Sequence, residues 1–312
     1  MATDQRQLPT RPEHLRTDPG RRRKEAVVRR IFMFAALTSV VISGAIVFSL
    51  VDGAANFLTA VDLSTLWADG WFPRRNLFDV KTLVVGTLIV AGIAMLVAAP
   101  LGLGAAIYLS EYARPRVRRV LKPILEILAG VPSVVLGFFA ISFITPSVIQ
   151  KLWPDAAFFN LAAAGVCVGI LTLPIVASVA EDALRAVPMS LREASYGLGG
   201  KKMTTSLRVV FPAAISGIVA ALIIGVSRAI GETMVVSIAS GATGGSLFST
   251  DIFGPGQTMT AAMAALGAGT DQVVGGAASF QSLYFVGLLL FVMTFVLNLF
   301  GEVFVRRVRQ KY

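Results

Sequence analysis

Two charged residues, Arg228 and Glu232, lie within the otherwise uncharged and mostly apolar stretch 209–250. Their i,i+4 spacing places both side chains on one face of a helix, one turn apart. Charges inside a membrane cost at least about 2.5–3.5 kcal/mol each on insertion scales, so they must face protein or water. A guanidinium can replace the hydration water of an oxyanion, and a nearby carboxylate keeps the empty site near neutral. The pair predicts an anion path or, alternatively, an ion pair that only joins helices.

Hydroxyl groups beside this pair favour the anion path. Ser227 precedes Arg228 and Thr233 follows Glu232, and each hydroxyl can donate one hydrogen bond to a passing anion. Further hydroxyls that a pore could use belong to Thr87, Ser133 and Thr172.

Glu126 is another charge at the edge of an apolar stretch, and Lys122 lies one turn before it. The spacing favours an interfacial i,i+4 ion pair whose side chains reach toward water. The alternative is a contact that gates the cytoplasmic end of a pore.

Apolar stretches supply the elements that must position these residues. The chain has 312 residues, of which 55% are hydrophobic and 15% charged, whereas soluble domains carry about 25% charged residues. About 20 apolar residues span a bilayer as a helix, which satisfies its own backbone hydrogen bonds. We therefore predict an all-α polytopic membrane protein with six transmembrane helices, over residues 31–51, 82–108, 124–147, 158–180, 213–240 and 283–304.

The basic residues predict the orientation of these helices. Nine Lys and Arg lie in residues 1–30, five in loop 111–123, five in loop 181–212 and four in residues 305–312. The alternate connections are poor in them, so the positive-inside rule places both termini in the cytoplasm. The net charge of +10 then reflects contact with anionic lipid and needs no nucleic acid. The first 24 residues predict a disordered tail before an uncleaved first helix.

Motifs for catalysis and for cofactors are absent. A single His, a single Cys and the lack of a G-x-x-x-x-G-K-[ST] sequence argue against histidine chemistry, a disulfide framework and ATP binding by a P-loop. We expect a chain that is not an enzyme and binds no metal or cofactor itself.

Loop 181–212 shows its own folding signals. Pro188 ends the fourth predicted helix, and Ser190 with Glu193 has the spacing of a capping box that starts a short helix. Gly199 and Gly200 then end that helix. A loop that only connects two helices needs no such caps, so we predict a rigid projection on which a cytoplasmic partner docks.

The same loop resembles a known motif. Glu193-Ala-Ser-x-x-x-Gly199, followed after nine residues by Val209-x-Phe211-Pro212, resembles the EAA loop of bacterial ABC importer permeases. The resemblance implies the type I (MetI-like) permease fold. It also implies a coupling helix that seats in the ATP-hydrolysing subunit through Arg192, Glu193, Ala194, Ser195 and Gly199.

A second resemblance concerns the charged pair. The segment 228–234, Arg-Ala-Ile-Gly-Glu-Thr-Met, is similar to the signature of PstC-type permeases of the phosphate-specific ABC transporter. Segments 100–111, 127–133 and 254–261 extend the likeness over about residues 82–304. We expect a basic tail at 1–30, a first helix at 31–51, a permease core at 82–304 and a cytoplasmic end at 305–312.

The resemblance also implies partners. They are a PstA-type permease subunit in a heterodimer, two PstB-type ATPase subunits that hold ATP and Mg, and a PstS-type phosphate-binding protein outside the cell. Inorganic phosphate would pass Arg228, Glu232, Thr233 and Ser227 across the bacterial inner membrane, with membrane lipid around the helices.

Other interpretations stay open. The chain could be the PstA-type sister subunit, or a permease for molybdate, sulfate or phosphonate. An ATP-independent transporter or channel would have no reason for an EAA loop, and a membrane scaffold or sensor would have no need of Arg228 for uptake.

Overall fold

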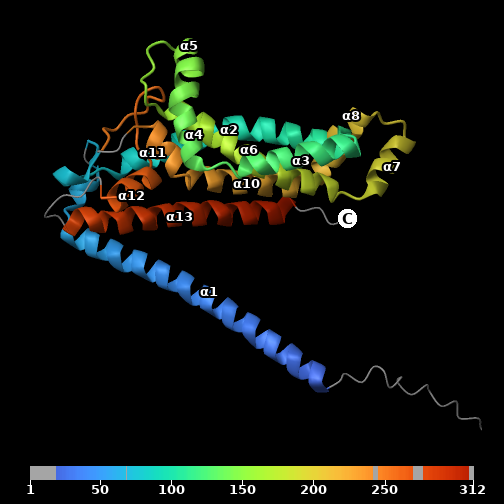
Figure 1. Cartoon of the computed structure of the whole chain (residues 1–312), viewed down its shortest axis with the longest axis horizontal. Helices are drawn as coiled ribbons and strands as arrows, with labels where there is room; N and C mark the ends of the chain where they lie inside the picture. Colours follow the sequence, from blue (N-terminus) through green and yellow to red (C-terminus); the bar gives the residue numbers. More distant parts are fainter. Residues whose placement is uncertain (1–18, 68, 242–244, 270–276, 309–312) are drawn as a thin grey trace, which may run out of the picture. The chain divides into compact units, whose positions relative to one another are not determined.

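The computed structural model in Figure 1 describes residues 19–67, 69–241, 245–269 and 277–308, and their side chains except those of residues 19–23, 277 and 308. It divides into two units, residues 1–50 and 51–312. Parts of the predicted basic tail and of the cytoplasmic end, residues 1–18 and 309–312, lie outside the described residues.

The first unit contains most of helix α1, Pro19–Ala60. This helix is longer than the predicted 31–51, and residues 19–24, which we predicted to be disordered, are helical. The reason is local, because the Arg, Lys, Glu and Ala residues before Ile31 are good helix formers. Within this first unit the large apolar side chains of the helix, among them Phe32, Phe34 and Phe48, are exposed, as expected for a helix in contact with lipid.

Helices α2 (Val80–Ile107) and α6 (Leu161–Arg185) form the most extensive helix pair of the second unit. Gly165 and Gly169 let them approach closely, because a Cβ at Gly169 would lie 2.8 Å from the carbonyl oxygen of Ala94. The side chains of Asp79 and Asn160 cap the two N-termini by accepting backbone N–H bonds. This pair is the frame on which the other helices pack.

The third predicted helix, 124–147, is divided. Helix α3 (Pro115–Ala129) ends at Gly130, and Pro132 starts α4 (Ser133–Phe139), which continues through the π-helical η5 (Ala140–Ile149) into α5 (Gln150–Leu152).

Prolines commonly break a helix, yet Pro100 and Pro174 both lie inside the continuous helices α2 and α6. A proline removes one backbone hydrogen bond, and the close packing of these two helices compensates for that loss.

The fifth predicted helix, 213–240, is also divided. Helix α10 (Ile215–Ile230) ends at Gly231, and α11 (Met234–Ala239) begins after Thr233. Helix α10 packs on α6, α2 and α13 (Ala277–Val308), and α11 packs on α4 and α6. The break therefore lies where several helices meet.

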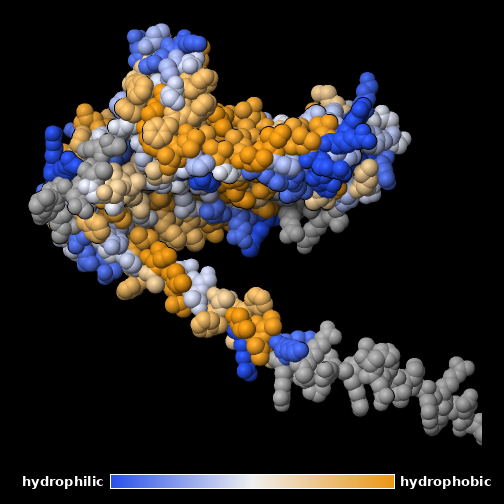
Figure 2. Space-filling view, viewed as in Figure 1, coloured by the Kyte–Doolittle hydropathy of each residue, from blue (hydrophilic) through white to orange (hydrophobic). Residues whose placement is uncertain are grey.

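The helices account for the expected spans. Within the described residues, five helices are long and apolar enough to cross a membrane, or up to six if one pair bent by 72° counts as a single span. That pair joins residues 202–213, which comprise α8 (Lys202–Thr205), the π-helical η6 (Ser206–Val210) and α9 (Phe211–Ala213), to α10. Figure 2 shows hydrophobic residues over much of the helices and hydrophilic residues gathered at the end that carries α7 (Met189–Gly197). The all-α polytopic prediction is confirmed.

At the opposite end of the second unit lies a small hairpin. It comprises the 3-10 turns η2 (Leu63–Trp67) and η3 (Pro73–Arg75) and the antiparallel strands β1 (Trp71–Phe72) and β2 (Leu77–Phe78). Trp71 and Phe78 are buried with Phe57 of α1 and Met259, the first residue of helix α12 (Met259–Gly267). This cluster packs the hairpin on Leu83 of α2, Met259 of α12 and Val286 of α13.

A close backbone crossing joins α2 to the segment before α12. A Cβ at Gly86 would lie 2.3 Å from the carbonyl oxygen of Gln257, and the Met259 N–H donates to the Thr87 hydroxyl at 3.0 Å. Gly86 is therefore required so that the backbone of the 254–258 segment can lie directly on α2.

We predict that Gly86→Ala destabilises the protein by about 1–3 kcal/mol, because the added methyl group overlaps backbone that cannot move alone. The matched control is Gly92→Ala on the same helix, where a Cβ meets nothing within 4 Å. Thermal unfolding of the detergent-purified protein measures both variants. Equal melting temperatures for the two variants would contradict the predicted crossing.

Candidate functional site

The predicted charged pair forms an ion pair at the break between α10 and α11. Arg228 Nη1 lies 2.8 Å from Glu232 Oε2, and the side chain of Arg228 is 40% exposed whereas that of Glu232 is 4% exposed. The carboxylate is therefore fixed in the protein, while the guanidinium lies at the surface of the chain.

Several hydrogen bonds hold this break in place. Glu232 Oε1 accepts the N–H of Val235, and the Thr260 hydroxyl of α12 donates to the carbonyl oxygen of Glu232 at 2.7 Å. The Ser227 hydroxyl donates to Asn298 Oδ1 of α13 at 3.0 Å. Glu232 thus joins α10, α11 and α12, and Ser227 joins α10 to α13.

The face of α10 that bears Arg228 is exposed in this chain. Ile224, Arg228 and Gly231 recur at helical spacing and are all exposed. A guanidinium on such a face cannot point at hydrocarbon without a large penalty. In the membrane this face must therefore border another protein subunit or water.

The hydroxyls singled out from the sequence fall into two groups. Thr87 and Thr172 are buried, and each donates to the carbonyl oxygen of its own preceding turn, so they belong to the helix packing rather than to a pore surface. Ser133 is half-buried at the start of α4, and Thr233 is half-buried beside Glu232.

The predicted projection exists as helix α7 and its flanking turns. The expected capping box is wrong: α7 begins at Met189 with Pro188 as its N-cap residue, and no side chain bonds that cap within the described residues. The fixed φ of proline already sets the entry to the helix. Gly199 follows the helix with φ +80°, a backbone conformation that favours glycine.

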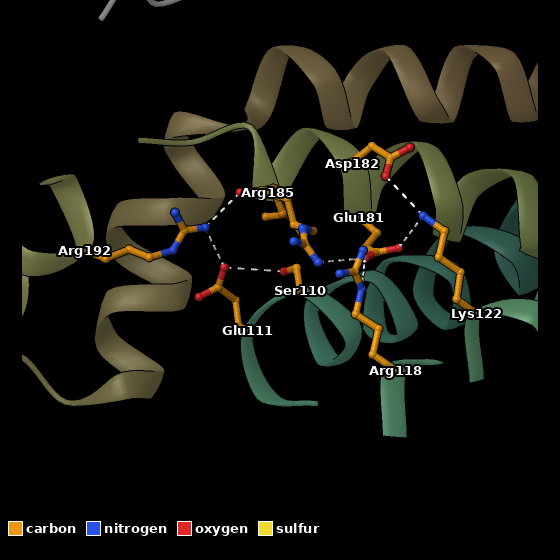
Figure 3. Close-up of polar contacts among 9 residues, drawn as sticks. Ser110, Glu111, Arg118, Lys122, Glu181, Asp182, Arg185 and Arg192 are labelled. Carbon is orange, nitrogen blue, oxygen red and sulfur yellow. Dashed lines mark hydrogen bonds and ion pairs between the residues drawn. The ribbon is translucent and has the colours of Figure 1, made fainter. Parts of the chain in front are cut away.

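Arg192 of this loop points into its own chain. Its Nη2 lies 2.8 Å from Glu111 Oε1 of the π-helical segment η4 (Tyr108–Tyr112) and also donates to the carbonyl oxygen of Leu184, while Nη1 donates to that of Val187. Figure 3 shows this guanidinium between the ends of α2 and α6. Because it is only 11% exposed, Arg192 holds the projection on the helix pair.

The neighbours of Arg192 face outward. Glu193 and Ala194 are exposed, and Leu198 is 90% exposed. The Ser195 hydroxyl, in contrast, lies 2.8 Å from the Thr205 hydroxyl and joins α7 to α8. The loop therefore presents one acidic and several apolar groups on a rigid support.

A second ionic cluster joins α3 to α6. Glu181 is 1% exposed; its Oε1 accepts from Arg118 Nε at 2.6 Å, and its Oε2 lies 3.2 Å from Lys122 Nζ. Lys122 Nζ also lies 3.3 Å from Asp182 Oδ1; Figure 3 draws the contact between these two side chains. Partial burial lowers the pKa of Lys122, but hydrogen bonds and charge attraction from Glu181 and Asp182 outweigh it and raise the pKa above its usual value.

The expected Lys122–Glu126 ion pair is wrong. Lys122 turns to Glu181 and Asp182, and the described residues show no ion pair between Lys122 and Glu126, which is exposed. Sequence reasoning also missed Glu111, Arg118 and Glu181. The partners in these pairs are 81 and 63 residues apart, so only charge at the predicted ends of helices could have signalled them.

Comparison with known proteins adds to this geometry. The family described as "Binding-protein-dependent transport system inner membrane component" matches residues 98–310. The chain is 30% identical to the phosphate transport system permease protein PstC of Mesorhizobium japonicum, over 88% of this chain and 87% of that protein. It is 35% identical to the phosphate transport system permease protein PstA 1 of Mycobacterium tuberculosis, over 77% and 76% respectively.

A solved structure shares the fold. A chain in the crystal structure of a bacterial ABC transporter that imports the acidic polysaccharide alginate superposes with a TM-score of 0.60, at 14% identity, over 93% of this chain and 100% of that one. These matches confirm the resemblances drawn from the EAA-like loop and from segment 228–234. The chain belongs to the family of inner membrane components of binding-protein-dependent transport systems.

Proposed function

We propose that this chain is the transmembrane subunit of an ATP-driven importer that passes inorganic phosphate across the bacterial cytoplasmic membrane. As a multi-pass inner-membrane permease subunit, it transports and is not itself an enzyme. The observation that carries the proposal is the half-exposed Arg228 beside the buried Glu232. Relatives named as phosphate transport permeases match most of the chain, which supports phosphate as the anion.

The pair suits an oxyanion that binds briefly. In the empty site Glu232 neutralises Arg228 at 2.8 Å. An arriving phosphate offers the guanidinium a second acceptor, so Arg228 can exchange the carboxylate for the anion while Glu232 stays fixed by Val235. The Thr233 hydroxyl and the Ser227 hydroxyl, if released from Asn298, supply further donors.

Two sister assignments remain relevant within this proposal. The sequence Met234-Val-Val236 favours a PstC-type subunit, and the match to PstC of M. japonicum covers more of the chain than the match to PstA 1 of M. tuberculosis. The higher identity with the latter, 35% against 30%, supports the PstA-type alternative. A permease for molybdate, sulfate or phosphonate is a further alternative that the same guanidinium could serve.

The proposal extends to partners and orientation. A PstA-type subunit would form the opposite wall of a water-filled path beside the exposed Arg228 face, and a PstS-type protein would deliver phosphate to that path. Two PstB-type subunits would hold ATP and Mg and bind α7 through Glu193 and its exposed neighbours. This chain itself would hold no cofactor. On the positive-inside rule, the basic loops support a cytoplasmic position for α7, both termini and the candidate gate residue Glu126.

We predict that Arg228→Gln lowers phosphate uptake roughly 100-fold, because it removes the charge-assisted contact to the anion and leaves the buried Glu232 unpaired, and removal of one partner of such a pair costs about 2–5 kcal/mol. Uptake of radiolabelled phosphate by cells that depend on this importer measures it. The control is Arg306→Gln, which removes a guanidinium that is 77% exposed near the end of α13. Normal uptake with Arg228→Gln protein present at wild-type level in the membrane would remove Arg228 from transport.

We predict that substitutions of Glu193 and Arg192, adjacent residues of the loop that bears α7, impair the transporter in different ways. Glu193→Gln should abolish stimulation of ATP hydrolysis by loaded binding protein without altering hydrogen exchange in residues 189–200, because its side chain is exposed. Arg192→Gln should abolish stimulation and also speed that exchange about tenfold, since the lost bonds are internal and each contributes about 1–3 kcal/mol.

Arg208→Gln is the control for this comparison, because Arg208 is an exposed residue of the same loop. Stimulation that persists in the Glu193 variant would exclude it from the ATPase contact. Unchanged exchange in the Arg192 variant would show that Arg192 does not hold the loop.

A further inference from the structure

A hollow lies beside the Glu181 cluster, at the end of the second unit that carries α7. It has a volume of about 590 Å³ and is lined by residues of η4, α3 and α6, including Ser110, Arg118, Arg119, Lys122, Glu126 and Arg185. A narrower recess of about 180 Å³ shares Lys122 and Glu126 and extends between the same helices to Ala129 and Pro174. Neither belongs to the Arg228 site.

The charge around this hollow is not balanced. Four basic side chains line it, and the carboxylates that line it or pair with them are Glu126, Glu181 and Asp182. Glu111 lies next to Ser110 but is paired with Arg192, so one positive charge is in excess. Glu181 forms close ion pairs with Arg118 and Lys122, whereas Arg185 Nη1 lies 4.0 Å from Glu181 Oε1. Arg119 makes no ion pair among the described residues. Arg119 and Arg185, both exposed, therefore have donors left for an anion.

The position of the hollow defines what can reach it. Val117, Val120, Ile124 and Ile127 are exposed along one face of α3, while Arg118, Arg119 and Lys122 line the hollow. Such an amphipathic helix lies at the boundary between hydrocarbon and water. Basic pockets at this depth meet phosphate groups, from lipid headgroups in the membrane or from anions in solution.

We propose that this hollow binds a phosphate group, supplied by an anionic phospholipid headgroup or by free inorganic phosphate. Arginine is suited to the task because its planar fork can contact two phosphate oxygens together. A phosphate group that bridges Arg119 and Arg185 joins α3 to the end of α6. Arg185 directly follows Leu184 in the sequence and precedes Val187 by two residues. The carbonyl groups of Leu184 and Val187 accept hydrogen bonds from Arg192 of the loop that bears α7.

This site goes beyond the proposed function, because a lipid headgroup can fill it whatever the importer carries. It also differs in location from Arg228, so each can fail separately. A loss of uptake with Arg228→Gln would leave the hollow intact, and loss of the hollow's ligand would leave the ion pair of α10 intact.

The test uses the assembled transporter purified with its partner subunits. In one arm, the complex in phosphatidylcholine nanodiscs is titrated with radiolabelled inorganic phosphate in the absence of binding protein. In the other arm, native mass spectrometry measures how much phosphatidylglycerol stays bound after purification from membranes. The variants are Arg119→Gln, which removes no ion pair among the described residues, and the double variant Arg119→Gln/Arg185→Gln.

Two controls accompany these variants. Arg116→Gln removes an exposed charge of the same helix that does not line the hollow. Arg228→Gln in the phosphate arm separates binding on the proposed transport path from binding in the hollow.

We expect the double variant to lower the amount of bound inorganic phosphate or of bound phosphatidylglycerol at least about tenfold, since each charge-assisted hydrogen bond contributes about a factor of ten in affinity. A loss confined to phosphatidylglycerol identifies a lipid site, and a loss confined to inorganic phosphate identifies a solute site. Unchanged occupancy in both arms, or an equal loss with Arg116→Gln, would overturn the proposal.

Discussion

The exclusion of unpaired charge from hydrocarbon is the constraint on which the rest of this structure depends. Arg228 can lie in the middle of an apolar segment only because Glu232 pairs with it across the end of α10, which stops at Ile230 between the two residues. The same constraint requires that the face bearing Arg228 be covered by protein or water. An isolated permease chain is thus incomplete at this position, as expected for a subunit that works in an assembly.

The loop that bears α7 depends on a related use of charge. Arg192 and Glu111 form a buried pair that also satisfies two carbonyl groups at the C-terminal end of α6. A helix end needs such partners, and here they come from the loop that faces the proposed ATPase. Movement of α7 would therefore be transmitted to α2 and α6 together, and these helices form the most extensive pair in the fold. Glu181 extends the connection to α3.

The sequence was sufficient for the class of fold and for the positions of most apolar helices, because hydrophobic length is a property of the chain alone. It was not sufficient for the breaks. Pro132 divides a helix, yet Pro100 and Pro174 do not, since tight packing at Gly165 and Gly169 holds α2 and α6 together. Spacing found the Arg228–Glu232 pair, but Arg118 with Glu181 and Arg192 with Glu111 depend on tertiary contacts that no local pattern encodes.

The central claim is that the face of α10 bearing Arg228 borders a water-filled path. The most direct test places a cysteine at Ile224, which is 45% exposed one turn before Arg228, and treats the assembled transporter in membranes with a charged methanethiosulfonate reagent. The native Cys167 is buried and does not interfere. The account predicts modification at least about tenfold faster than at a cysteine replacing Leu96, 77% exposed on α2, because thiolate forms in water and not in lipid. Equal and slow reaction at both positions would contradict it.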